Sequence, residues 1–232
     1  MSLRVYIPRD AGAVAVGADD VALALQAAAR LRGIGLDIVR TGSRGLYWLE
    51  PMVEVATAAG RVAYGPVATG DVPDLLDAML DNKPHALRLG STEEIAWLKR
   101  QSRLTFARCG VTDPLSLDDY RAHGGGQGLA RALSLGPAAT VAEVTQSGLR
   151  GRGGAGFPTG IKWRTVAQTE SDRKFIVCNA DEGDSGTFAD RMIMEGDPLL
   201  LIEGMAIAGL AVGATNGYVY IRSEYPHAVA AI

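Results

Sequence analysis

Alternating apolar and polar positions predict a small α/β domain in the first third of the chain. Alternation with a period of two indicates a strand, and apolar residues recurring at helical spacing indicate an amphipathic helix. The expected elements are a strand at 3–7, a helix at 20–31, a strand at 36–40, a hairpin of 51–55 and 61–64, and a helix at 74–80. This β-α-β-β-β-α order is the first indication of a fold class.

The remaining apolar runs predict a second α/β region. Residues 140–149 are expected to form a short helix, and the apolar run 174–178, bounded by polar residues, a buried strand. The most apolar stretch, 199–212, is too short to span a bilayer and is expected to be a buried helix beside that strand. Between the two regions, residues 91–108 are expected to be helical.

Length and charge limit the classes of protein to which the chain can belong. A chain of 232 residues can hold two domains, and a net charge of −3 argues against nonspecific nucleic-acid binding. The first residues lead directly into an expected strand rather than a signal peptide, so we expect neither secretion nor a membrane partner. The expected boundaries are residues 1–82 for the first domain, 83–135 for a helical connector and 136–232 for the second domain.

The segment 151–160 carries the most informative chemistry, because five of its ten residues are glycine. Glycine leaves backbone N–H groups open to a ligand, and amides that lead into a helix N-terminus form an anion site. Lys162 adds positive charge close to this segment. The pattern therefore favours a cofactor that carries a phosphate group.

The spacing of these glycines also fits other interpretations. Gly151, Gly153 and Gly156 match G-x-G-x-x-G, the dinucleotide fingerprint, but a helix rather than a strand is expected before them. A standard Rossmann loop is therefore not predicted. A flexible linker is the other alternative, and bulky residues such as Phe157 disfavour it.

An acidic segment follows the expected strand 174–178. Its carboxylates within ten residues are Asp181, Glu182, Asp184 and Asp190. Carboxylates at the end of a strand can accept hydrogen bonds from ribityl or ribose hydroxyl groups or from the edge of a flavin. The structural alternative is an acidic turn in which Asp184 or Ser185 caps the next helix. The ligand spacing of an EF-hand is absent.

Taken together, these segments resemble the NADH-oxidising flavoprotein (FMN) subunits of complex I and of related hydrogenases and formate dehydrogenases. The motifs that carry the resemblance lie, in the family's order, at 113–120, 147–163, 178–184 and 218–226. Within the family the chain looks most like the β (diaphorase) subunit of the molybdenum- or tungsten-dependent, NAD-linked formate dehydrogenase. Complex I subunits usually carry Glu where Asp184 stands and an aromatic residue near Thr165, so these departures favour the hydrogenase and formate dehydrogenase branch.

The resemblance implies FMN and NAD as cofactors and assigns residues to each. Family members hold FMN with the glycine loop, its lysine and the polar residues at the strand end, and they stack NAD(H) over the flavin. No side chain is assigned as an acid–base catalyst or metal ligand. The implied FMN residues are Gly151, Gly153, Lys162, Asn179 and Asp181, with Glu182 beside them, and the implied NAD residues are Gly154, Ala155, Phe157 and Asp184. Arg152, in the same loop, is implied as a cofactor-binding residue without assignment to either cofactor.

The first domain resembles the thioredoxin-like ferredoxin domain of the same enzymes but lacks its cluster ligands. Ser43 and Tyr47 stand where the second cysteine pair of that domain would fall, and the chain's two cysteines, Cys109 and Cys178, lie elsewhere. The expected fold class is thus α/β, a thioredoxin-like domain without cluster cysteines followed by a Rossmann-like flavin-binding domain. Two unpaired cysteines are consistent with a reducing, cytoplasmic compartment.

The implied function is that of a redox junction within a multi-subunit formate dehydrogenase. Family members continue beyond the position of Ile232, and that part carries the cysteines of a 4Fe–4S cluster. The expected partners are a molybdenum or tungsten iron–sulfur subunit, a small 2Fe–2S subunit and NAD(H). The alternatives are a hydrogenase diaphorase, a complex I subunit, and a scaffold that has lost its cofactor.

Overall fold

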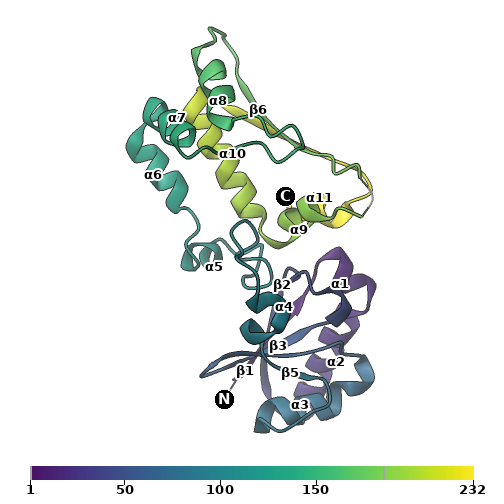
Figure 1. Cartoon of the computed structure of the whole chain (residues 1–232). Coiled ribbons are helices and arrows are strands. Elements are labelled where there is room, and N and C mark those ends of the chain that lie inside the picture. Colours follow the sequence, from purple (N-terminus) through teal and green to yellow (C-terminus); the bar gives the residue numbers. More distant parts are fainter. Residues whose placement is uncertain (1, 185) are drawn as a thin grey trace. The chain divides into compact units, whose positions relative to one another are not determined.

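The computed structural model describes residues 2–184 and 186–232, and the chain divides into two compact units. Unit 1 consists of Met1–Ser116, Met192–Asp197 and Ala230–Ile232, and unit 2 of Leu117–Arg191 and Pro198–Val229. Figure 1 shows the helices and strands of both.

Unit 1 contains a five-stranded sheet and the helices that pack on it. The strands are β1 (Ser2–Pro8), β2 (Gly35–Thr41), β3 (Val53–Thr57), β4 (Gly60–Tyr64) and β5 (Arg88–Ser91). The helices are α1 (Ala11–Ala15), α2 (Ala18–Leu31), α3 (Val72–Asp81) and α4 (Ala96–Lys99), with 3-10 turns η1 (Tyr47–Leu49), η2 (Thr69–Asp71) and η3 (Thr92–Glu94).

The strand order confirms the expected thioredoxin-like architecture. The sheet runs β2-β1-β3-β4-β5, with β1 and β2 parallel and the other pairs antiparallel. Every strand and helix expected before residue 82 is present, with bounds that differ by a few residues at most.

Helices α2 and α3 close the core of unit 1. They contact each other, and α2 also contacts β1 and β2 (Figure 1). Val21 and Leu25, one helical turn apart on α2, are at most 1% exposed and pack with Val5 and Ile7 of β1. The spacing of four residues on the helix and two on the strand is the pattern that predicted these elements.

The prediction of a helix over residues 91–108 is wrong. Only η3 and the four-residue α4 form there, and the chain continues without regular structure to residue 116. Side chains from the sheet and its loops bind this segment: Arg61 donates to the carbonyl oxygens of Gly110 (3.1 Å) and Val111 (2.6 Å). Within residues 91–108 themselves, the Arg103 guanidinium donates to the Arg44 carbonyl oxygen at 3.2 Å, so long-range contacts hold this segment as well.

Glu50 is a buried carboxyl group of unit 1 whose ionisation should control stability. It is 5% exposed and accepts hydrogen bonds from the Ser43 hydroxyl (2.8 Å) and the Met52 amide (3.1 Å). Burial, reinforced by the charges of Asp10 and Glu54 and opposed by these hydrogen bonds, raises the pKa of Glu50 from 4.5 to about 7. Between these values the folded state holds a proton that the unfolded chain has released, so stability falls as pH rises.

We therefore expect Glu50→Gln to remove a pH dependence. Between pH 5 and pH 8 the wild type should lose about 2 kcal/mol of unfolding free energy relative to this variant. Urea denaturation at both pH values measures the difference. Glu94→Gln, which changes an exposed carboxylate paired with Lys99, is the matched control and should keep the wild-type dependence. Equal pH slopes for wild type and Glu50→Gln would contradict the assignment.

Unit 2 is built from helices around a two-stranded parallel sheet. Its strands are β6 (Phe175–Ala180) and β7 (Asn216–Ile221). Its helices are α5 (Leu117–Ala122), α6 (Gln127–Leu135), α7 (Pro137–Gln146), α8 (Thr159–Gln168) and α10 (Pro198–Val212), and it holds the first residues of α9 (Ala189–Gly196) and most of α11 (Pro226–Ala231).

Helix α10 is the expected apolar helix beside the sheet. It contacts α6, α7 and α8 as well as β6 and β7. Apart from Pro198 at its start, the buried residues of this helix lie in its C-terminal half, at Ala208, Gly209, Ala211 and Val212, whereas Ile202 is 43% exposed. The helix covers one face of the sheet, because Val177 and Tyr218, paired on the other face, are 63% and 58% exposed.

Candidate functional site

The glycine loop is closed at its base by main-chain contacts. Arg150 and Pro158 form an antiparallel bridge, and the Gly151 amide donates to the Phe157 carbonyl at 2.9 Å. The Arg150 guanidinium also donates to the carbonyl oxygen of Gly156 at 2.6 Å. The loop joins α7 to α8, so the expected helix–loop–helix order is confirmed, and these contacts disfavour a flexible linker.

The tip of the loop presents main chain without side chains in front of it. Gly154 and Gly156 have φ of +92° and +59°, the left-handed region that favours glycine. At Gly153, Gly154 and Gly156, no described atom lies within 4 Å of the position that a Cβ atom would take. Residues 151–155 are all exposed, including Arg152 and Ala155. Such an open surface fits a bulky ligand that approaches the backbone closely.

Gly160 differs from the loop glycines because packing requires it. A Cβ atom there would lie 2.5 Å from the Cα atom of Thr145 on α7. Gly160 is the second residue of α8, so the missing side chain allows the start of α8 to approach α7 closely. The same glycine-rich motif therefore contains open glycines and one packing glycine.

Lys162 lies in the first turn of α8, next to the loop. Its Nζ atom is 5.8 Å from the centre of the Phe157 ring, and Phe157 is 46% exposed. A cation near a helix N-terminus is disfavoured by the helix dipole. An anion bound there is stabilised both by the dipole and by the nearby ammonium group of Lys162. Loop amides, helix terminus and ammonium group together suit a phosphate, so the residues present fit the expected cofactor.

The predicted strand-end polar residues lie at the carboxyl end of β6, which is paired with β7. The strands are parallel and pair in register up to Ala180 and Ile221, so the segments that follow them start at the same edge of the sheet. Asn179 and Asp181 are exposed, and the Asn179 Oδ1 atom accepts from the Asp181 amide at 3.2 Å. Asp184 is exposed as well. In open α/β sheets this edge is where ligands bind.

Glu182 differs from the other predicted cofactor residues because its side chain is buried. It is 6% exposed, and its carboxylate accepts from the amides of Asp190 (2.9 Å) and Arg191 (3.1 Å), at the start of α9. Burial, reinforced by the charge of Glu182, raises the pKa of Asp190. The acidic segment therefore does cap the next helix, α9, but through Glu182 rather than Asp184. Ser185, the other expected cap, lies outside the described residues.

Sequence reasoning assigned no role to Arg222 and Tyr225, which the structure places beside Glu182. The Arg222 Nη1 atom donates to the Glu182 carbonyl oxygen at 2.6 Å, and the Tyr225 hydroxyl lies 3.3 Å from the Glu182 Oε2 atom. Both residues belong to the 218–226 motif. Their proximity could have been expected from the rule that ends of parallel strands share an edge.

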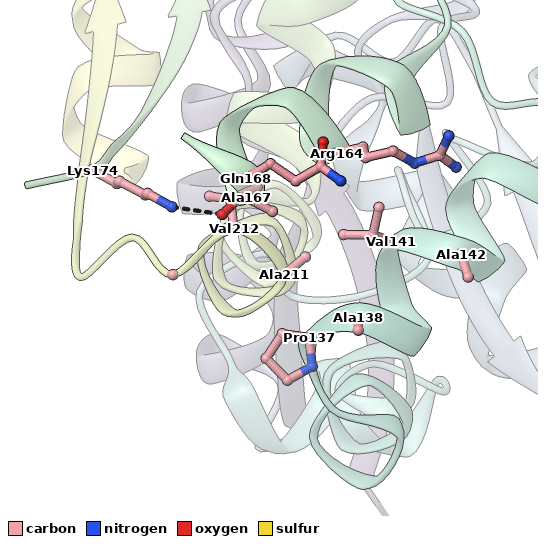
Figure 2. Close-up of a pocket in the computed structure, with 11 residues that line it drawn as sticks. Pro137, Ala138, Val141, Ala142, Arg164, Ala167, Gln168, Lys174, Ala211 and Val212 are labelled. Atoms are coloured by element: carbon pink, nitrogen blue, oxygen red, sulfur yellow. Dashed lines mark hydrogen bonds between the residues drawn. The ribbon is translucent and has the colours of Figure 1, made fainter. Parts of the chain in front are cut away.

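A pocket of about 490 Å³ lies elsewhere in unit 2, as Figure 2 shows. Helices α7 and α8 and the end of α10 line it with small apolar side chains, and Lys174 at its rim donates to the Ala167 carbonyl at 3.0 Å. Lys174 precedes β6 and Gly213 precedes β7, so the pocket is at the amino ends of the strands. Asn179, Asp181 and Asp184, at the carboxyl end of β6, therefore lie at the opposite edge.

Both cysteines are free thiols. Cys109 is fully buried, and burial raises the pKa of its thiol to about 12, while Cys178 is partly buried. Within residues 2–184 and 186–232, no group of three or more His, Cys, Asp or Glu side chains could hold a metal ion. The same residues contain no helix long and apolar enough to cross a membrane.

Comparison with known proteins identifies the C-terminal part of the chain. The Nuo51 FMN-binding domain matches residues 144–232. The chain is 56% identical over 131 residues to the NADP-reducing hydrogenase subunit HndC of Solidesulfovibrio fructosivorans, covering 56% of this chain and 26% of that protein. It is 54% identical over 111 residues to a subunit of the NADH-quinone oxidoreductase of Aquifex aeolicus, covering 48% and 26%.

A third relative is the NAD-reducing hydrogenase HoxS subunit alpha of Cupriavidus necator, 47% identical over 97 residues, with 42% of this chain and 16% of that protein covered. The chain thus spans about a quarter or less of the length of these curated relatives. The matched segment contains the glycine loop, α8, both strands and the acidic segment between them. Residues 144–232 belong to the Nuo51 FMN-binding domain family of complex I-like flavoproteins.

Proposed function

We propose that the chain is the FMN- and NAD(H)-binding part of a diaphorase subunit. The observation that carries the proposal is the open glycine loop in front of α8, with Lys162 in the first turn of that helix. The family match over residues 144–232 supports FMN as the ligand. FMN, when bound, exchanges hydride with a nicotinamide and single electrons with iron–sulfur clusters.

Each predicted residue has a proposed part in holding these ligands. The Gly153 amide, with Arg152 and Lys162, would bind the FMN phosphate, and Gly151, whose amide closes the loop on the Phe157 carbonyl, would lie along the adjoining ribityl chain. Asn179 and Asp181 would bind the flavin, with Glu182 beside them. The nucleotide would contact Gly154, Ala155, Phe157 and Asp184. The protein's contribution is orientation and charge, and no side chain acts as an acid–base catalyst.

We further propose that the native complex oxidises formate. Asp184 and Thr165, where the sequence departs from the complex I pattern, favour the formate dehydrogenase and hydrogenase branch. On this proposal the partners are a molybdenum or tungsten iron–sulfur subunit and a small 2Fe–2S subunit, in the cytoplasm, and a 4Fe–4S cluster lies in a further part of the same subunit. A hydrogenase diaphorase is the nearest alternative, since two relatives are named as hydrogenase subunits.

The electron donor is tested by assaying NAD⁺ reduction by the native complex with formate, with hydrogen and with neither. We expect formate to support the reaction and hydrogen to fail. Hydrogen-dependent reduction without a formate response would overturn the formate assignment and favour the hydrogenase alternative. Repeating the assay with NADP⁺ separates the two nucleotides, because one relative is named as NADP-reducing.

A further inference from the structure

The segments that follow β6 and β7 are joined by the Arg222 guanidinium. Its Nη1 atom donates to the Glu182 carbonyl oxygen at 2.6 Å, two residues after β6 ends. Its Nε and Nη2 atoms lie 3.4 and 3.2 Å from the Glu224 carboxylate oxygens. One side chain therefore connects the main chain beyond β6 with a residue beyond β7.

Glu182 is also held through its side chain. The Tyr225 hydroxyl lies 3.3 Å from the Glu182 Oε2 atom, and the Arg222 guanidinium carbon lies 5.3 Å from the centre of the Tyr225 ring. The Glu182 carboxylate is also bound by the amides of Asp190 and Arg191. Glu182 is thus fixed through both its carbonyl and its carboxylate groups.

These contacts determine what Glu182 can do at the site. Its carboxylate is buried and engaged by protein donors, whereas Asp181 before it and Asp184 two residues after it are exposed. Gly183, between Glu182 and Asp184, would leave this turn free to move without an anchor. Anchoring Glu182 orders the turn before a ligand binds, so less conformational entropy is lost on binding.

We propose that Arg222 is a positioning residue, which ties the Glu182 carbonyl group to the end of β7 and so holds the Asp181 and Asp184 carboxylates in place for the cofactors. The proposal rests on the proposed flavin and nucleotide site. Glu182, held at both its carbonyl and its carboxylate groups, anchors this turn beside the proposed flavin residues Asn179 and Asp181.

Arg222→Gln tests the proposal, with Arg164→Gln as the matched control. Arg164 belongs to the same unit but donates to the Thr145 hydroxyl at 3.2 Å, near the amino ends of the strands. We expect Arg222→Gln to raise the FMN dissociation constant of the deflavinated protein about tenfold. Hydrogen–deuterium exchange should accelerate at the amides of 181–184 and stay unchanged in α10. The control should leave both readouts at wild-type values.

Two milder variants keep the test valid if Arg222→Gln fails to fold. Arg222→Lys keeps the positive charge but loses the planar fork that reaches Glu182 and Glu224 at once, and Tyr225→Phe removes only the hydroxyl group. Each should move both readouts in the same direction by a smaller factor. Wild-type FMN affinity with unchanged exchange at 181–184 in these variants would overturn the positioning role. If the wild-type protein binds no FMN, the proposed function fails, and the exchange data still show whether Arg222 holds the turn.

Discussion

Replacing Lys162 by alanine is expected to weaken FMN binding about 50-fold, because a charge-assisted hydrogen bond to phosphate is lost. The same change should not destabilise the fold. Lys162 lies in the first turn of α8, where the helix dipole disfavours a cation. Weaker FMN binding with unchanged or higher thermal stability would therefore identify Lys162 as a residue retained for its ligand.

Fluorescence titration of the deflavinated protein with FMN measures this change, and Lys174→Ala is the matched control. Lys174 donates to the Ala167 carbonyl at 3.0 Å, at the amino end of β6. Its replacement should leave FMN affinity unchanged while slightly lowering the melting temperature. Equal FMN affinity in wild type and Lys162→Ala would contradict the assignment of Lys162 to the phosphate.

Alanine in place of Gly160 is expected to destabilise unit 2 by about 3 kcal/mol, because it would overpack the contact between α7 and α8. The new Cβ atom would lie 2.5 Å from the Thr145 Cα atom and 2.3 Å from its hydroxyl oxygen. Backbone cannot yield as a flexible side chain does, so the helices must separate. FMN binding should suffer as well, since α8 carries Lys162.

Gly153→Ala is the matched substitution at an open glycine of the same loop. No described atom lies within 4 Å of its Cβ position, so unfolding in urea should match the wild type. Its added methyl group should still weaken FMN binding, because it stands between the backbone and the ligand. Loss of stability in Gly153→Ala, or wild-type stability in Gly160→Ala, would contradict this division of the glycines.

Much of the fold could be predicted because local pattern and tertiary structure agree. The β-α-β-β-β-α order of unit 1 follows from apolar periodicities that the sheet and helices then bury. The helix expected over 91–108 failed because long-range contacts decide that segment. Arg103, within this segment, donates to the carbonyl oxygen of Arg44, 59 residues earlier in the chain.

The sequence predicted which types of residue form the candidate site, but not the role of each one. Composition and order indicated the glycine loop and the acidic segment, and the structure places the acidic segment at the carboxyl edge of the sheet. Composition could not separate Glu182 from Asp181 and Asp184, because burial is a property of the fold. Nor could it show that Arg222, forty residues away, would hold the Glu182 carbonyl group.

An anaerobic titration of the purified holoprotein with NADH tests the central claim most directly. If the glycine loop and the strand ends hold FMN for exchange with NAD(H), visible flavin absorbance will bleach in proportion to the NADH added, and denaturation will release FMN. A spectrum that NADH leaves unchanged, with no FMN released on denaturation, would contradict the account and favour a scaffold that has lost its cofactor.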